Sequence, residues 1–162
     1  MISALTGEFK QEAANTRKLL ERVPQEHFSW KPHEKSMTLL RLALHVAEMT
    51  RWAIITVQQT ELDFSKDYPK SPEIKTTADL LSFFDQLKSE AIAALENNRE
   101  ETLAENWTLR NGEHVYFTMP KAVVLRSMVF NHIIHHRGQL TVYLRMLDVP
   151  VPGLYGPSAD EK

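Results

Sequence analysis

Cysteine is absent from the 162-residue sequence. This absence excludes disulfide bonds, thiolate metal ligands and a cysteine nucleophile, and it leaves histidine, aspartate and glutamate as anchoring ligands for a metal ion. An excess of one charge is also missing, because 19 lysine and arginine residues stand against 21 aspartate and glutamate residues, for a net charge of -2. Such a balance provides no electrostatic attraction to nucleic acid or to an anionic membrane, so we expect neither as a partner.

Long hydrophobic runs are missing as well. No apolar run approaches the roughly 20 residues that a membrane-spanning helix needs, and residues 1–7 lack the basic start and apolar core of a signal peptide. We therefore expect a cytoplasmic protein. The hydrophobic share of 43% and the charged share of 25% are ordinary for a globular protein, and the length predicts a single domain over residues 1–162.

Apolar residues recur at three- and four-residue spacing in four stretches, which predicts four helices and an all-α fold, a four-helix bundle. We expect these helices over residues 3–22, from Ser36 or Thr38 to about Gln59, from the capping sequence at Thr76 to about Asn98, and from Pro120 to the prolines after Val149. The polar connection over residues 60–75 is longer than a tight turn needs, which favours a crossover along the bundle. Residues 105–119, with Asn-Gly at their centre, predict a small β-hairpin or an irregular loop before the last helix.

The last predicted helix carries three histidines in five residues, at positions 132, 135 and 136. His132 and His136 are four residues apart, which places both on one face of an α-helix, about one turn apart. Apolar residues from Leu125 to Leu147 share that face. We therefore expect the histidine pair at the centre of the buried face and Arg137 on the opposite face.

Two imidazoles side by side in a low-dielectric core must stay neutral, find partners or bind a cation. A shared metal ion resolves this, and His45, on an apolar face of the second predicted helix, offers a third ligand; the alternative is three core histidines with ordinary partners. Ile133 stands where a zinc protease helix needs glutamate, and the faces show only Glu48 near the site, so neither a metalloprotease nor a dinuclear carboxylate centre is expected. Three neutral nitrogen ligands suit a divalent zinc or nickel ion.

Three segments resemble the DinB family, also called the DinB/YfiT-like family of metalloenzymes. They are residues 35–48, which contain the second-helix histidine, residues 132–140, which read HIIHHRGQL, and the tail over residues 149–158. The resemblance implies a four-helix bundle of up-down-down-up topology and a divalent metal ion held by His45, His132 and His136. It also implies a homodimer, because members of the family are often dimeric.

The chemistry that the resemblance implies is thiol transfer. Characterised relatives include thiol S-transferases and a thiol-dependent isomerase that use low-molecular-weight thiols such as bacillithiol or mycothiol. We therefore interpret the protein as a metal-dependent enzyme of the thiol S-transferase type that acts on a small-molecule substrate. Trp52, Arg137, Gln139 and Tyr143 are candidates for its pocket or for contacts with the metal ligands, and each also fits a packing or surface role.

Two alternative functions stay open at this point. A metal-dependent hydrolase would use a metal-bound water as nucleophile and Glu48, one turn after His45, as base. A structural metal site or a ligand-binding protein without turnover would be closed by a fourth protein ligand such as Glu48 or His135.

Overall fold

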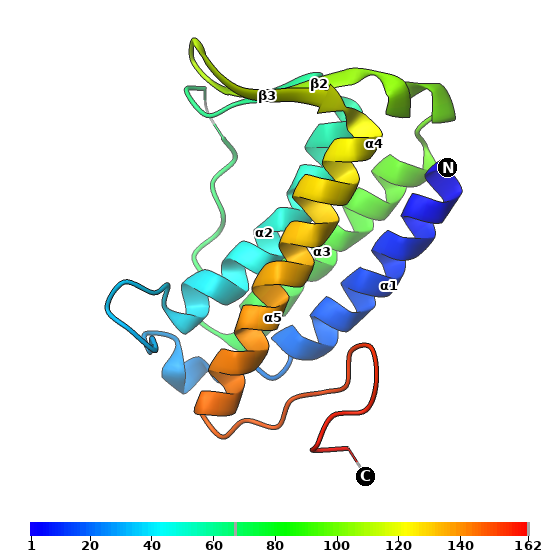
Figure 1. Ribbon diagram of the computed structural model, residues 1–162. Helices are drawn as coiled ribbons and strands as arrows, with labels where there is room; N and C mark the ends of the chain where they lie inside the picture. Colours follow the sequence, from blue (N-terminus) through cyan, green and yellow to red (C-terminus); the bar gives the residue numbers. More distant parts are fainter. Residues whose placement is uncertain (67, 162) are drawn as a thin grey trace.

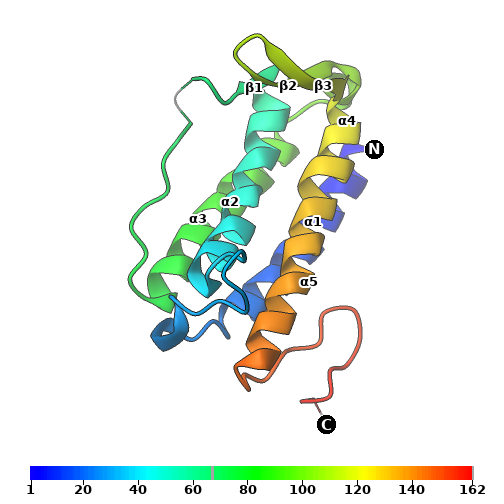
Figure 2. The ribbon, with the colours of Figure 1, turned by 60° about the vertical axis from the view of Figure 1, so that its left-hand side comes forward.

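The computed structural model describes residues 1–66 and 68–161 and is mostly helical. Four long helices lie side by side (Figures 1 and 2): α1 (Ile2–Leu20), α2 (Leu39–Gln58), α3 (Thr77–Glu96) and α5 (Asn131–Met146). α1 and α2 each contact both α3 and α5, so the four helices enclose one shared core. None of the helices in the described ranges is long and apolar enough to cross a membrane.

A small sheet lies at one end of the helices and defines their directions (Figure 1). α2 and α3 run toward the sheet, whereas α1 and α5 run away from it. The amino group of Met1 contacts Glu100 Oε1 at 2.8 Å in the short helix η2 (Glu100–Ala104), so the start of α1 lies beside the end of α3. The connection between α2 and α3 therefore spans the length of the helices, as its length predicts.

The N-termini of α2 and α3 are each capped by a nearby threonine side chain. Thr38 is the residue that caps α2, and its hydroxyl accepts a hydrogen bond from the backbone of Arg41 at 3.2 Å. A short 3-10 turn, η1 (Gln25–His27), lies in the loop before this cap. The predicted capping box of α3 is confirmed, because the Thr76 hydroxyl accepts from the Asp79 backbone and the Asp79 carboxylate accepts from the Thr76 backbone.

The sheet has three strands in the order β1 (Glu61–Asp63), β2 (Asn106–Asn111) and β3 (His114–Pro120). β2 and β3 form the predicted antiparallel hairpin, and Gly112 in its turn takes a left-handed conformation with φ of 58°. Strand β1 is missing from the sequence prediction. It pairs parallel to β2, and Asp63 accepts a hydrogen bond from the Gly112 backbone at 2.9 Å, so contacts with a distant part of the chain hold it.

The helix after the hairpin is not the single α-helix from Pro120 that the sequence predicts. Pro120 ends β3 and precedes a short helix, α4 (Lys121–Val124), and a π-helical segment (Leu125–Phe130) then leads directly into α5. Such segments are rare inside helices and are frequent at functional sites. Here the π-helical segment lies immediately before the turn that carries His132.

The buried face of α5 also differs from the prediction. The buried residues of this helix are Ile133, Arg137, Leu140 and Leu144. His132 and His136 are only half-buried, at the edge of that stripe. The prediction that the histidine pair lies at the centre of the buried face is therefore wrong, and solvent reaches the pair.

The difference arises because Arg137 occupies the buried face of α5, whereas a charged residue is expected at the surface. Its side chain is 1% exposed, and its guanidinium contacts the carboxylate of Glu12 and the hydroxyl of Thr16 on α1. The hydroxyl of Tyr155, in the C-terminal tail, contacts the same guanidinium and donates to Glu12 at 2.7 Å. A paired charge thus occupies a core position and joins α5 and the tail to α1.

Candidate metal centre

Three imidazoles converge between α2 and α5. His45 lies in the second turn of α2, and His132 and His136 lie in the first two turns of α5. The Nε2 atoms of His45 and His132 are 3.4 Å apart, and one ring nitrogen from each histidine lies within 4.8 Å of the other two. Ligand nitrogens that share one zinc ion lie roughly 3–3.5 Å apart, since each is about 2.0–2.1 Å from the metal.

Each imidazole has an inner nitrogen, which faces the other histidines, and an outer nitrogen, which faces away from them. The outer nitrogens of His136 and His45 face side-chain acceptors. His136 Nδ1 lies 2.7 Å from Gln139 Oε1, and a hydrogen bond donated there leaves Nε2 of His136 as the nitrogen with a free lone pair. His45 Nδ1 faces Glu48 Oε2 at 3.8 Å. The structure therefore places Gln139 and Glu48, two of the candidates from the sequence, on the outer side of two candidate ligands.

His132 completes the group, because its Nε2 faces the Nε2 of His45. The rings of His136 and His45 thus have an acceptor on the outer side and a nitrogen directed to the inner side. Metal-binding histidines adopt this arrangement because the outer hydrogen bond fixes the tautomer and raises the basicity of the ligand nitrogen. The residues present therefore fit a divalent metal ion.

The site favours neutral imidazoles, which are the form that binds metals. Burial, together with the neighbouring His136 and His45, lowers the pKa of His132 from its ordinary value of 6.5 to about 4. Burial is also the largest cause that lowers the pKa of His136, and the positive charge of Arg41 acts in the same direction. Both imidazoles are therefore deprotonated at neutral pH.

Glu48 is a fixed carboxylate. Burial raises its pKa, but the neighbouring His45 and the hydrogen bonds from Ser71 and Arg41 outweigh burial and lower the pKa to about 2. Ser71 Oγ donates to Oε1 at 2.6 Å, and Arg41 Nη1 donates to Oε2 at 2.8 Å. So acidic a carboxyl group is a weak proton acceptor near neutral pH.

Arg41 and Ser71 are neighbours of the site that the sequence reasoning missed. Arg41 lies four residues before His45, a spacing that puts both on one helix face and could have identified it. Ser71 reaches Glu48 only because the connection between α2 and α3 passes over α2, and no local pattern indicates that contact.

The three histidines form an open group. Across the described part of the chain, no other histidine or carboxylate joins them as a fourth candidate ligand. His135 is exposed, and its ring packs edge-on against His136 with centroids 4.8 Å apart. Glu48 faces the outer nitrogen of His45 rather than the inner one. A metal ion held here would keep coordination positions for water or a substrate.

Three further candidates make their observed contacts away from the inner ring nitrogens. Trp52 packs against Trp107 of the sheet, with ring centroids 6.4 Å apart. Tyr143 packs edge-on against Trp30, with centroids 5.5 Å apart, and so joins α5 to the loop before α2. Arg137, expected on the face opposite the histidines and named as a candidate for the pocket or for packing, is buried against α1 and makes its contacts there.

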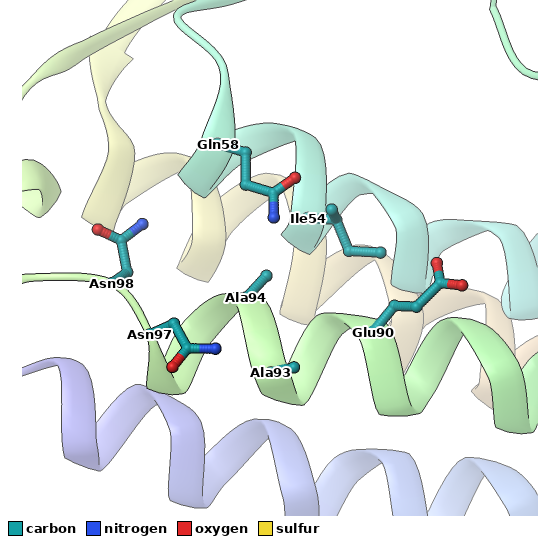
Figure 3. A pocket seen from close by; sticks show the side chains of 7 residues that line it. All are labelled: Ile54, Gln58, Glu90, Ala93, Ala94, Asn97 and Asn98. Carbon is teal, nitrogen blue, oxygen red and sulfur yellow. The ribbon is translucent and has the colours of Figure 1, made fainter.

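A surface hollow of about 540 Å³ lies on a different flank, between the C-terminal turns of α2 and α3 (Figure 3). Its lining residues are Ile54, Gln58, Glu90, Ala93, Ala94, Asn97 and Asn98. Ile54 and Gln58 on α2 face Ala93 and Ala94 on α3, and one carboxylate lies at the rim. This lining contains no histidine and no set of metal ligands, so the histidine group is the better candidate for chemistry.

The comparisons with known proteins agree on one family. The DinB family matches residues 3–162 of the chain. The chain is 31% identical over 154 residues to uncharacterized protein YrdA of Bacillus subtilis (strain 168), a match that covers 93% of this chain and 85% of YrdA. It is 28% identical over 130 residues to uncharacterized protein YjoA of the same organism, covering 80% of each chain.

Two crystal structures have a similar fold. A DinB-like protein from Bacillus subtilis, YjoA, aligns with a TM-score of 0.72 and 20% identity over 98% of this chain and 99% of that one. A DinB-like protein from Bacillus cereus ATCC 10987 aligns with a TM-score of 0.71 and 23% identity over 94% of this chain and 97% of that one. At these identities the likeness shows a shared fold.

Proposed function

The chain belongs to the DinB family, and from this premise we propose that it is a divalent-metal-dependent enzyme of the thiol S-transferase type. The observation that carries the proposal is the convergence of His45, His132 and His136 without a fourth protein ligand in the described ranges. Sites with three protein ligands and an open position are typical of catalytic metals, whereas structural zinc sites are closed by four.

We propose zinc or nickel as the ion, because three neutral imidazoles suit both. When bound, the ion would supply the positive charge that lowers the pKa of a coordinated thiol. The chain itself supplies the geometry: Gln139 and Glu48 orient the rings of His136 and His45. The partial exposure of the histidines gives a small molecule access to the inner nitrogens.

The proposed reaction joins a low-molecular-weight thiol to an electrophile. The thiol gives its proton to water, its sulfur forms a bond to an electrophilic carbon, and the leaving group departs with the electron pair of the bond that breaks. Thiols of the bacillithiol or mycothiol type, which the family resemblance implies, are the proposed thiol class.

Hydrolysis with Glu48 as base fits the site less well. Its pKa of about 2 and its bonds to Arg41 and Ser71 make this carboxylate a poor proton acceptor. If the protein has hydrolytic activity, replacing Glu48 with glutamine should change it little. A loss of hydrolysis by several orders of magnitude, with metal content unchanged, would instead favour Glu48 as the base.

Cobalt substitution tests the transferase proposal directly. Cobalt(II) gives an intense charge-transfer absorption when a thiolate sulfur binds it, so we expect added mercaptoethanol or bacillithiol to produce that band in the parent protein. The His132→Ala variant should not show it. Turnover is then measured with each thiol and a set of electrophiles such as chlorodinitrobenzene. Cobalt binding without a thiolate band and without turnover would contradict the transferase proposal and favour a structural or ligand-binding site.

We also propose that the helices form an up-down-down-up bundle and that the chain forms a homodimer. The helix directions in Figures 1 and 2 support the first statement, and the family resemblance supports the second. Sedimentation equilibrium should give about twice the chain mass of 18.7 kDa. A single-chain mass at all accessible concentrations would contradict the dimer.

A further inference from the structure

Arg41 is a cation held at the edge of the histidine site. It lies in the first turn of α2, one turn before His45, and its side chain is 50% exposed. Its Nη1 donates to Glu48 Oε2 at 2.8 Å, and the same oxygen lies 3.8 Å from His45 Nδ1. One carboxylate oxygen thus links the guanidinium to a candidate metal ligand.

The first turns of α2 lie beside the part of α5 that follows His136. The two helices run in opposite directions, and the Tyr143 hydroxyl on α5 donates to the Met37 carbonyl, just before α2, at 3.3 Å. Arg41 stands between Met37 and His45 in the sequence, so this residue lies on the stretch of α2 that leads to the histidine group.

Glu48 restrains the guanidinium without using all of its donors. Ser71 Oγ holds Glu48 Oε1 at 2.6 Å, which fixes the carboxylate that Arg41 contacts. Among the described residues, Nη1 is the guanidinium nitrogen of Arg41 that has a hydrogen-bond partner. A guanidinium carries five N–H groups in a planar fork, and this geometry binds a carboxylate through two parallel hydrogen bonds.

We propose that Arg41 binds the carboxylate of the molecule that occupies the histidine site, and that it selects small thiols carrying a carboxylate. The inference rests on the proposed function for the thiol and adds the anionic group and the residue that recognises it. Arg41 is a specificity-determining residue in this account: it positions one end of the ligand while the sulfur lies at the inner nitrogens of the histidines.

Arg126 provides a matched control within the same chain. Its side chain is also 50% exposed, and it also forms an ion pair with one glutamate, Glu8. Glu8 lies on α1, so this pair is on a different side of the last helix from the contact with α2. A general effect of removing one exposed arginine should therefore appear in both variants, whereas ligand selection should depend on Arg41 alone.

The experiment compares two thiols that differ in charge. Mercaptopropionate and uncharged mercaptopropanol are titrated into the cobalt-loaded protein, and the thiolate absorption band gives the dissociation constant of each. We expect the parent to bind mercaptopropionate about twofold to fivefold more tightly, the range for an exposed ion pair. Arg41→Gln should remove this preference, Arg41→Lys should restore part of it, and Arg126→Gln should keep all of it.

Equal affinities of the parent for the two thiols, or an equal loss in the Arg41→Gln and Arg126→Gln variants, would overturn the inference. Failure of the proposed function has a different signature, because then cobalt binds and neither thiol produces the band. In that case succinate is titrated against the cobalt spectrum. Binding that weakens in Arg41→Gln alone keeps Arg41 as a carboxylate-binding residue, and binding that is absent or independent of Arg41 overturns that role too.

Discussion

At the histidine site, contacts to the outer ring nitrogens determine which nitrogen is available to a metal ion. Gln139 occupies the outer side of the His136 ring, and Glu48 occupies the outer side of the His45 ring. Such outer contacts fix the tautomer and the orientation of a ligand before the metal arrives. Residues that do not touch the metal should therefore supply a measurable share of the metal affinity.

Replacing Gln139 with alanine should weaken metal binding by about 10- to 100-fold, the usual cost of losing such a contact. The loss should occur because His136 Nδ1 no longer has its acceptor at 2.7 Å. Competition with a chromophoric chelator measures the affinity. Gln86→Ala is the matched control, since Gln86 donates to Glu90 on the exposed face of α3, and this variant should bind metal like the parent. Equal affinities in all three proteins would argue against the orienting role.

The metal-free protein should lose stability in acid through His132. Its pKa is about 4 in the folded protein and 6.5 for an unperturbed imidazole, so between these values the unfolded chain binds more protons and acid favours unfolding. The contribution of His132 to the free energy of unfolding is fully present above its pKa in the unfolded chain. This contribution is lost as the pH falls toward the pKa of His132 in the folded protein. Urea unfolding at several pH values measures it. His132→Asn should reduce the slope, and His33→Asn, in an exposed loop, should not.

The histidine group could be found from sequence because its spacing is local on α5 and because His45 is the remaining histidine on an apolar helix face. Gln139 and Glu48 followed for the same reason, since both lie within one turn of a histidine. Ser71 could not be found, because its contact with Glu48 depends on the path of the connection between α2 and α3. Arg137 was placed on the wrong face because its partners are distant in sequence: Glu12 is 125 positions away, and Tyr155 is 18 positions away.

At the scale of elements, the pair between Arg137 and Glu12 fixes how α5 packs on α1. Arg137 directly follows His136, so the orientation of the metal-binding turn depends on which face of α5 is buried. The pair occupies a core position in which both side chains are almost fully buried. Removing one partner leaves a buried charge without compensation.

Glu12→Ala and Arg137→Met should each lower the free energy of unfolding by about 3–5 kcal/mol. The double variant should lose clearly less than the sum of the two, because it leaves no unpaired buried charge. Denaturant unfolding of the four proteins gives the coupling. The exposed pair of Lys10 and Glu96 is the control, with an expected effect of at most about 1 kcal/mol. Additive losses for the buried pair would contradict its structural role.

Elements with local signals were predictable and elements with non-local causes were not. The capping box at Thr76 and the Asn111-Gly112 turn each depend on residues that are close together in the sequence, and both occur where expected. The three-residue strand β1 exists through its parallel pairing with β2, some 47 positions away, as in the pair Glu61 and Thr108. The π-helical segment differs from an α-helix in its i→i+5 hydrogen bonds, and over only six residues the apolar pattern of the sequence does not distinguish the two.

For the whole molecule, the site joins two helices that are far apart in sequence. His45 and His132 are 87 positions apart, and α2 and α5 contribute both the ligands and part of the shared core. A metal ion that binds this site therefore bridges two packed elements and binds the folded state only. Metal binding must then stabilise the fold by mass action.

Zinc or nickel should raise the melting temperature of the metal-free protein. At a free metal concentration 100 times the dissociation constant the gain is about 2.7 kcal/mol, which corresponds to about 5–10 °C for a chain of this size. Differential scanning fluorimetry with and without metal measures it, and magnesium, which prefers oxygen ligands, is the control ion. Equal shifts in the parent and in His45→Ala would show that the metal acts elsewhere.

The central claim, that His45, His132 and His136 hold one divalent ion, is tested most directly by the metal content of the purified, untagged protein. Elemental analysis compares the parent with His132→Ala and with His135→Ala, whose exposed histidine lies outside the group. We predict about one equivalent of zinc or nickel in the parent and in His135→Ala, and loss of that equivalent in His132→Ala. No metal in the parent after reconstitution at neutral pH, or the same content in all three proteins, would contradict the claim.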